Sequence, residues 1–439
     1  MNSNKFFDEA REKGISASEL SSSKSTSFSF TLFKGELTSY SVDSSTRVSA
    51  RGIYNGKIGF GSTESNDNSA VKFLVNAISE TASLNESEDE PIIFKGADKY
   101  FKRNVYSKKL NERTVDDKLE LCHKIEEKLK AADPRISDVE VEFQSNDGER
   151  IFSNSYGLRL KDKSNYFFIY ATIVIKDGEE IKTNDKIFFN TDQDAFDLDK
   201  FCDEIVEKGL EKLHAQSIKV GKYKAVIDKS CVASLLGALL SHVSSEEVQK
   251  HSSKLEGKLN QKVLSDKLTI YEKPHLKNIF FSYFDDEGVP TQDKTIFDKG
   301  VLKTYFYNLV TAKKDGVEST GNAARNGSKM SISFSNIVVK PGRLSKEDLF
   351  KKIKNGIYVT EINGLHAGLN PTSGDFSLQA EGFHIVDGKK DKPITLFTLS
   401  GNLFDLFNDI IAVGKDSELL LSSFTTPSIA FKNLKVSSE

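Results

Sequence analysis

The sequence of 439 residues contains no tryptophan and only three cysteines. Cys122, Cys202 and Cys231 show no CxxC spacing. This pattern predicts reduced, buried thiols in a cytosolic protein and argues against a disulfide framework. Because the chain has 31 phenylalanines, we expect phenylalanine to dominate its aromatic core.

Long apolar runs are also missing, and none approaches the roughly 20 residues that a membrane-spanning helix needs. The mean hydropathy of −0.40 predicts a soluble chain. The first residues contain acids and no apolar segment, so we expect no secretory signal. The net charge of −3 predicts no general basic surface for nucleic acid. We therefore expect a cytoplasmic protein without membrane contact or direct nucleic-acid binding.

One local concentration of basic and aromatic residues stands against that overall charge. It consists of Lys99, Lys102, Arg103, Lys108 and Lys109 with Tyr100, Phe101 and Tyr106. A nucleic-acid patch would use such a combination, but we favour a solvated linker between two domains. The range 98–113 is accordingly the internal boundary that we expect in the first half.

The length predicts two or three domains. Residues 4–20 have helical spacing, 27–64 read as a β-meander, and 68–84 are again helical. The same order follows in residues 114–132, 139–175 and 198–213, so an ancient duplication is a hypothesis. We expect domains at 1–105, 106–218 and 219–439.

Turn residues divide the predicted strands. Asn55-Gly56, Asp147-Gly148, Asp177-Gly178 and Asp387-Gly388 each predict a turn. From residue 221, a short strand leads into an apolar helix at 230–240, which we expect to continue to about residue 259. Strands then recur up to residue 339, and a helix follows at 345–354. The fold class is therefore α+β, with a large, mainly antiparallel C-terminal domain.

The stretch 366–416 combines turns with short alternating strands. Asn370-Pro371 and Ser373-Gly374-Asp375 predict turns, and the residues from Phe376 onward alternate between apolar and polar. Asn402 is the expected N-cap of a helix with the apolar stripe Leu403, Phe404, Leu406 and Phe407.

Six motifs in this order resemble the signature of the TldD/PmbA family. They are 316–323, 372–377, 381–383, 386–388, 400–403 and 412–416. The resemblance covers about residues 221–416 in detail and the first half only in architecture. It includes an STGN segment at Ser319-Thr320-Gly321-Asn322.

What the resemblance implies is a relation to a zinc peptidase. The active branch of the family has an HExxxH motif on the first helix of the C-terminal domain and a further cysteine ligand near the chain end. Here Leu236, Gly237 and Ser241 stand at the motif positions, and no cysteine follows Cys231. We therefore expect the PmbA (TldE) branch, without cofactor or metal in this chain and with zinc only in a TldD-like partner.

Two other histidines are further candidates for metal ligands. His242 with Glu246, and Glu247 with His251, have i,i+4 spacing on the expected long helix. We interpret both as ordinary surface pairs on a polar helix end. His366 lies in a flexible segment before the signature, where substrate contact and plain loop packing are equally good interpretations.

No catalytic motif of another class is present. The sequence has no G-x-S-x-G elbow, P-loop or G-x-G-x-x-G. The STGN segment would present backbone N–H groups to an anion or peptide carbonyl, or it is simply a turn. Our candidates for a substrate cleft are Ser319, Thr320, Asn322, His366, Asn370, Asp375, Glu381 and Asn402.

The resemblance implies a subunit that partners a TldD-like zinc peptidase, as a homo- or hetero-oligomer, and handles unfolded or extended polypeptides. Strand addition to the sheet-rich C-terminal domain would hold such a peptide. One alternative is an autonomous hydrolase that uses His366 with Asp375 or Glu381. Another is a homodimeric peptide-binding protein without an enzymatic partner.

Overall fold

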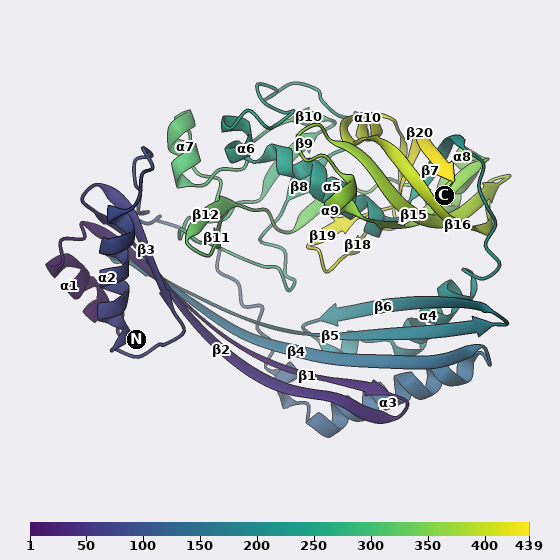
Figure 1. Ribbon diagram of the computed structural model, residues 1–439, viewed down its shortest axis with the longest axis horizontal. Coiled ribbons are helices and arrows are strands. Elements are labelled where there is room, and N and C mark those ends of the chain that lie inside the picture. The colour runs from purple at the N-terminus through teal and green to yellow at the C-terminus, as the bar shows by residue number, and fades with distance from the viewer. Residues whose placement is uncertain (439) are drawn as a thin grey trace. The chain divides into compact units, whose positions relative to one another are not determined.

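The computed structural model describes residues 1–438 (Figure 1). The chain forms two compact units that are not continuous in sequence. Unit 1 contains residues 1–210, 277–291 and 308–331, and unit 2 contains 211–276, 292–307 and the residues from 332 onward. Both units mix helices with mainly antiparallel sheet, so the predicted α+β class is confirmed.

Unit 1 is built on a six-stranded antiparallel sheet with the order β3-β2-β1-β4-β5-β6. Its strands are β1 (Ala17–Phe33), β2 (Glu36–Tyr54), β3 (Lys57–Thr63), β4 (Ile136–Asn154), β5 (Arg159–Asp177) and β6 (Glu180–Asn190). Its main helices are α1 (Ser3–Glu12), α2 (Ala70–Ser83), α3 (Val115–Ala132) and α4 (Leu198–Leu210). Helix, three strands and helix thus occur twice, as expected. Duplication as the origin of this order stays a hypothesis.

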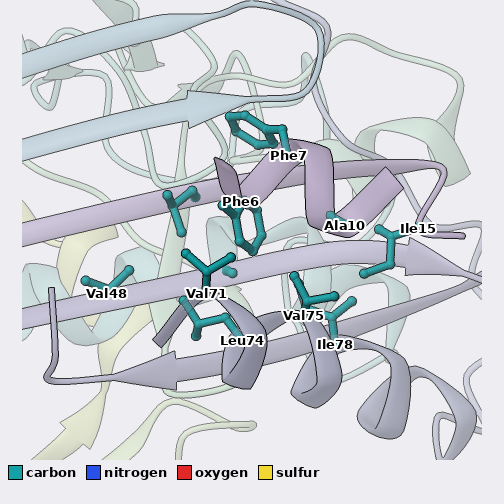
Figure 2. Packing of buried hydrophobic residues seen from close by; sticks show 11 residues of the cluster. Phe6, Phe7, Ala10, Ile15, Val48, Val71, Leu74, Val75 and Ile78 are labelled. Carbon is teal, nitrogen blue, oxygen red and sulfur yellow. The ribbon is translucent and has the colours of Figure 1, made fainter. Parts of the chain in front are cut away.

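The helices of unit 1 cover one face of the sheet at two places. Phe6 of α1 and Val71 of α2 join Leu20 of β1 in one buried cluster, shown in Figure 2. Phe30, further along β1 on the same face, stacks on Phe143 of β4. Because successive strand residues alternate between faces, Glu19 points to the opposite face from Leu20.

Two segments from the second half of the sequence cover that opposite face. Phe152 of β4 packs against Phe284 and Tyr283, which belong to the 277–291 segment. The 308–331 segment adds α7 (Leu309–Asp315) and the hairpin β11 (Ala323–Asn326) and β12 (Lys329–Ile332). These two segments are therefore part of the first unit, although most of the neighbouring sequence belongs to the second.

The turn predictions were partly right. Asn55 and Gly56 both have positive φ, at 49° and 75°, as a two-residue hairpin requires. Asp147-Gly148 is not a turn, because it lies inside β4 and pairs with β1 on one side and β5 on the other. The predicted helix at 4–20 was too long, since α1 ends at Glu12 and β1 begins at Ala17.

The basic and aromatic segment at 98–113 is anchored to unit 1. The hydroxyl of Tyr100 donates to the carbonyl of Gly288 at 2.8 Å. The hydroxyl of Tyr106 donates to the carboxylate of Asp147 at 2.6 Å. The segment connects the two halves of unit 1 and its basic side chains are exposed, as a solvated linker requires, but Tyr100 and Tyr106 also fix it to the body of the unit.

Unit 2 contains a sheet that closes on itself. The order is β16-β15-β14-β7-β20-β17, and β16 also pairs with β20. The strands are β7 (Gly221–Ile227), β14 (Gly356–Asn363), β15 (Asp375–Val386), β16 (Lys389–Asn402), β17 (Ile410–Val413) and β20 (Ile429–Ser438). Among the described strands of this sheet, β7 pairs with β14 in parallel and the other pairs are antiparallel. The second sheet has the order β10-β9-β8-β13-β19-β18, with strands β8 (Ile270–Glu272), β9 (Lys294–Asp298), β10 (Val301–Leu302), β13 (Ile337–Val339), β18 (Glu418–Leu419) and β19 (Phe424–Thr426). In this second sheet β13 and β19 also pair in parallel.

The helices of unit 2 are α5 (Lys229–Leu240), α6 (Ser245–Gln249), α8 (Lys346–Ile353), α9 (Leu365–Gly368) and α10 (Leu403–Asn408). The helix predicted at 230–259 was wrong beyond Leu240, where a short 3-10 turn at Ser241–Val243 interrupts it. Within residues 1–438, no helix has the length and apolar character needed to cross a bilayer.

Candidate functional site

The C-terminal end of α5 carries the residues aligned with the zinc motif. Leu236 is fully buried in the core. A side-chain carbon placed on Gly237 would lie 3.7 Å from the ring of Phe424 in β19. The hydroxyl of Ser241 donates to the carbonyl of Ala238 at 2.7 Å. Zinc in proteins is bound by imidazole, thiolate or carboxylate, so these three positions do not fit the metal.

His242 follows directly and is buried, with 2% of its surface exposed. Its Nδ1 accepts the backbone N–H of Lys254 at 3.2 Å, so the proton of the neutral ring lies on Nε2. Nε2 has no hydrogen-bond partner among residues 1–438. Burial is the main cause that lowers the pKa of His242, and the ring is therefore held neutral.

The predicted i,i+4 pairs on one long helix do not form. His242 lies on the 3-10 turn, and His251 lies beyond the end of α6 with a left-handed φ of 57°. Nδ1 of His251 lies 2.8 Å from the carboxylate of Glu256 instead. Among residues 1–438, no three histidine, cysteine, aspartate or glutamate side chains form a group that would hold a metal ion.

Two of the predicted cleft residues, Asn370 and Asp375, lie in the turn at 370–375, and a third, Asn402, bonds to it. The side-chain oxygen of Asn370 accepts the N–H groups of Thr372 and Ser373, both at 3.0 Å. The backbone N–H of Asn370 donates to the carbonyl of Asp375 at 2.8 Å, which closes the turn. Asn370 therefore shapes the turn, as its type predicts.

Asn402 fastens this turn to the start of α10. Its side-chain oxygen accepts the N–H of Phe404 at 3.0 Å, which confirms the predicted N-cap. Its Nδ2 donates to the carbonyl of Ser373 at 2.8 Å and to the carboxylate of Asp375 at 2.9 Å. Hydrogen bonds from Asn402 and from the hydroxyl of Ser373 lower the pKa of Asp375. Asp375 is thus an ionised carboxylate on an exposed, well-defined turn.

Phe404 brings this turn next to the end of α5. Its ring lies 5.1 Å from the ring of His242 in an edge-to-face arrangement. A side-chain carbon on Gly374 would lie 3.4 Å from the same phenylalanine. The sequence therefore predicted two parts of one site separately, and the contact through Phe404 was missed.

A polar hollow of about 690 Å³ lies beside the turn. Its lining combines carboxylates, amides and two lysines with the apolar side chains of Phe376, Leu406 and Leu434. It includes Asp375, Asn402, Asp405, Asn408, Asp409 and Asn433, with Lys222 and Lys435. Lys222 and Lys435 are directly opposite each other on β7 and β20.

His366 and Glu381 do not share this arrangement. His366 lies on the short helix α9 and is exposed. Glu381 lies in β15, where its carbonyl accepts the hydroxyl of Thr360. The carboxylate oxygens of Asp375 are both hydrogen-bonded within the turn, so the geometry gives no support to a His366–Asp375 pair.

The remaining candidates, Ser319, Thr320 and Asn322, belong to unit 1. The hydroxyl of Thr320 donates to the side-chain oxygen of buried Asn322 at 2.7 Å. Gly321 has a φ of 70°, and a side-chain carbon there would lie 2.5 Å from the carbonyl oxygen of Pro290. The segment therefore requires glycine at its centre.

A buried cluster of charges holds this segment. The Oε1 atom of Glu19 accepts Nε of Arg51 and Nη2 of Arg325, both at 2.8 Å. Arg51 also contacts Oε1 of Glu287 at 3.3 Å, and Oε2 of Glu287 accepts the N–H of Leu309 at 2.9 Å. Asp285 accepts the N–H of Ala323 at 3.0 Å, directly after Asn322.

The electrostatics of this cluster follow from its burial. Burial opposes the charge on Arg51, but Glu19 and Glu287 outweigh it and raise the pKa of Arg51. Burial, followed by the neighbouring Glu287, raises the pKa of Asp285 well above its usual range. Sequence reasoning missed the cluster because Glu19 was assigned to a helix. The detectable signal was a charged residue at an inward position of a strand.

Comparisons with known proteins agree with the motifs. Three consecutive family models match the chain, described as PmbA/TldA metallopeptidase domain 1 at residues 18–82, central domain at 108–213 and C-terminal domain at 220–438. The chain therefore belongs to the PmbA/TldD metallopeptidase family.

Relatives with known names support this membership. The Metalloprotease PmbA of Escherichia coli O157:H7 is 26% identical over 331 residues, which cover 75% of this chain and 71% of that protein. Metalloprotease MJ0996 of Methanocaldococcus jannaschii is 27% identical over 404 residues, covering 89% and 87%.

Solved structures have the same fold. A Thermotoga maritima protein, described as a candidate modulator of a DNA gyrase, has a TM-score of 0.89 at 27% identity and covers 99% of both chains. The TldE of Thermococcus kodakarensis has a TM-score of 0.90 over 99% of both chains. At 24% identity, that second likeness concerns the fold alone.

Proposed function

We propose that this protein is a PmbA/TldE-like subunit without its own zinc site, which works with a TldD-like zinc peptidase on unfolded or extended polypeptides. The observation that carries the proposal is the end of α5. Leu236 is buried, Gly237 has no side chain, and the hydroxyl of Ser241 is bonded to its own helix. None of the three supplies a ligand of the kind that zinc prefers.

The free edges of unit 2 support a role in holding an extended peptide. The larger sheet is closed through β16 and β20, whereas the second sheet ends in the short strands β10 and β18. β18 pairs with β19, whose Phe424 lies beside Gly237. An extended peptide added to β18 would lie about 10 Å from β19, the strand that carries Phe424, because neighbouring strands are about 5 Å apart.

The predicted cleft residues have different roles in this proposal. Asp375 and His366 present side chains to solvent and would contact substrate or partner. Asn370 and Asn402 shape the turn from which Asp375 projects. Ser319, Thr320 and Asn322 form a second candidate segment for the cleft, and Glu381 is a candidate on β15.

The test mixes the purified chain with a TldD-like subunit and measures association, zinc content and cleavage of an unfolded polypeptide. We expect this chain alone to hold no stoichiometric zinc and to cut nothing, and the mixture to associate and cut. A TldD-like subunit with glutamine in place of the motif glutamate is the matched control, which should still associate but not cut.

The alternatives give different results in the same assay. Cleavage by the isolated chain that is lost in His366→Ala would replace the proposal with an autonomous hydrolase. Binding of the polypeptide by the isolated chain, without association with a TldD-like subunit, would replace it with an independent peptide-binding protein.

A further inference from the structure

Two lysines lie side by side in the closed sheet of unit 2 without a carboxylate to neutralise them. Lys222 of β7 and Lys435 of β20 are directly opposite each other on neighbouring antiparallel strands (Figure 1). Like charges in this arrangement destabilise a sheet. Within residues 1–438, neither ammonium group has a hydrogen-bond or ion-pair partner. An anion bound between the two lysines would therefore relieve their repulsion.

A second pair of like charges, of the opposite sign, lies on α10. Asp405 and Asp409 are four residues apart, and the N–H of Asp409 donates to the carbonyl of Asp405 at 3.1 Å. This spacing puts both carboxylates on one face of the helix, where like charges repel. Asp405 is exposed and has no side-chain partner in the described chain, and Asp409 uses only Oδ2, which accepts Nδ2 of Asn433 at 2.9 Å. A bound cation would relieve this second repulsion.

Both pairs line the same polar hollow, and all four residues belong to unit 2. The volume of about 690 Å³ lies in the range of small-molecule sites, roughly 300–1,000 Å³. Three apolar side chains also line the hollow, so the carbon atoms of a ligand would find contacts there: Phe376, Leu406 and Leu434. The hollow therefore offers a cationic, an anionic and an apolar part to one ligand.

The separation of the two charged pairs limits the length of a ligand that contacts both. Asn433, which holds Asp409, is two residues from Lys435 along β20, and two strand residues span about 7 Å. An extended peptide covers at most about 3.5 Å per residue, so two residues span the same distance. Because lysine side chains are long and flexible, a third residue also fits between the pairs.

We propose that this hollow binds a short peptide of two or three residues by its two charged ends. Lys222 and Lys435 hold the C-terminal carboxylate, and Asp405 and Asp409 hold the N-terminal ammonium group. An ion of one sign would relieve only one of the two repulsions. Such peptides are products of polypeptide cleavage, so their source rests on the proposed function, whereas the binding itself is a property of this chain alone.

Blocking either end of the peptide gives the first test. Isothermal titration calorimetry of the full chain compares trialanine with its N-acetylated form and its C-terminal amide. We expect trialanine to bind, and each blocked form to bind about fivefold more weakly, because each loses one charged contact. Inorganic phosphate is the control for a simple anion site and should bind more weakly than trialanine.

Substitutions then assign each end of the peptide to one pair. Lys222→Met should weaken trialanine binding about fivefold and leave binding of the C-terminal amide unchanged, since the amide has no carboxylate to lose. Asp405→Asn should weaken trialanine binding by a similar factor and leave the N-acetylated form unchanged. Lys224→Met is the matched control and should bind like the parent protein, because Lys224 is exposed on the same strand but does not line the hollow. Circular dichroism checks that each variant is folded.

Each outcome decides the proposal. Absence of trialanine binding overturns it, and so do equal affinities for the blocked forms, tighter binding of phosphate, or an unchanged affinity in Lys222→Met or Asp405→Asn. Association of the parent chain with a TldD-like subunit is measured in parallel. Trialanine binding without association supports the peptide site and contradicts the proposed subunit role, whereas association without trialanine binding contradicts the peptide site alone.

Discussion

The Ser319–Asn322 segment of unit 1 and the 370–375 turn of unit 2 carry two parts of the same family signature. Each segment is held by hydrogen bonds that involve a carboxylate, but the carboxylate is buried in the first case and exposed in the second. The first segment is fixed by Asp285 and by the buried ion cluster of Glu19, Arg51 and Glu287. The second is fixed by hydrogen bonds of exposed or half-exposed side chains around Asn402.

This difference in burial decides how much stability each region loses when a residue is mutated. A buried charge that loses its partner destabilises strongly, since water cannot replace the partner. An exposed hydrogen bond that is lost is largely replaced by water. We therefore expect the first segment to be rigid and sensitive to mutation, and the turn to be adaptable, as a surface that contacts partners or peptides would be.

The largest effect should come from Arg51→Met. It leaves Glu19 and Glu287 buried without their shared cation, and we expect a loss of about 3–5 kcal/mol in the free energy of unfolding. Chemical denaturation measures it. Arg135→Met is the control, because Arg135 pairs with Asp133 and Asp177 at the surface. Similar losses in both variants would contradict the argument that burial makes the loss of a charged partner costly.

Gly321→Ala should have the next largest effect. Its side-chain carbon would lie 2.5 Å from the carbonyl oxygen of Pro290, in addition to the strain of a left-handed alanine. Gly327→Ala, with a φ of 61° and open space around it, has the strain alone, of about 1 kcal/mol. We expect Gly321→Ala to lower the unfolding free energy by at least about 1 kcal/mol more. An equal decrease in Tm for Gly321→Ala and Gly327→Ala would show that the backbone around residue 321 moves to make room for the added carbon.

Asn402→Ala should have a moderate effect, because it removes the cap of α10 and both donors to the turn. The expected loss is about 1–2 kcal/mol. Asn402→Ser keeps a capping oxygen but loses the donors, so the difference between the two variants isolates the cap. If Asn402→Ser is as destabilising as Asn402→Ala, the donors to Ser373 and Asp375 are the important contacts.

The smallest effect concerns the pH dependence beside the turn. The pKa of His242 lies below its ordinary value of 6.5 in the folded protein. As the pH falls below 6.5, the unfolded chain therefore binds more protons at this histidine than the folded protein does. This difference lowers the free energy of unfolding as the pH decreases. In His242→Phe, the unfolding free energy should fall less steeply over that interval. His366→Phe, at an exposed position, is the control and should follow the parent protein.

The sequence predicted local features well where backbone conformation alone decides them. Asp387-Gly388 adopts positive φ at both positions between β15 and β16, and Asn55-Gly56 does the same between β2 and β3. Asp147-Gly148 has the same residue types but lies within a strand, because pairing with neighbours on both sides outweighs its turn preference. Such tertiary competition is invisible in a short window of sequence.

The candidate site was predicted in part for the same reason. Asn370, Asp375 and Asn402 meet because the ends of β15 and β16 pair with each other. The contact of His242 with Phe404 and the cluster of Glu19, Arg51 and Glu287 join residues far apart in sequence. Periodicity and turn chemistry carry no information on those distances.

The closure of the larger sheet has a consequence for how the protein is made. β7 comes at the start of unit 2, yet one of its two neighbours is β20, and β20 also pairs with β16. During synthesis on the ribosome, β7 can pair with β20 only after nearly the whole C-terminal half has emerged. Nascent chains with such distant pairings fold slowly and expose strand edges meanwhile. Chaperones that bind emerging polypeptides would therefore meet this half of the chain while β7 is still unpaired on one side.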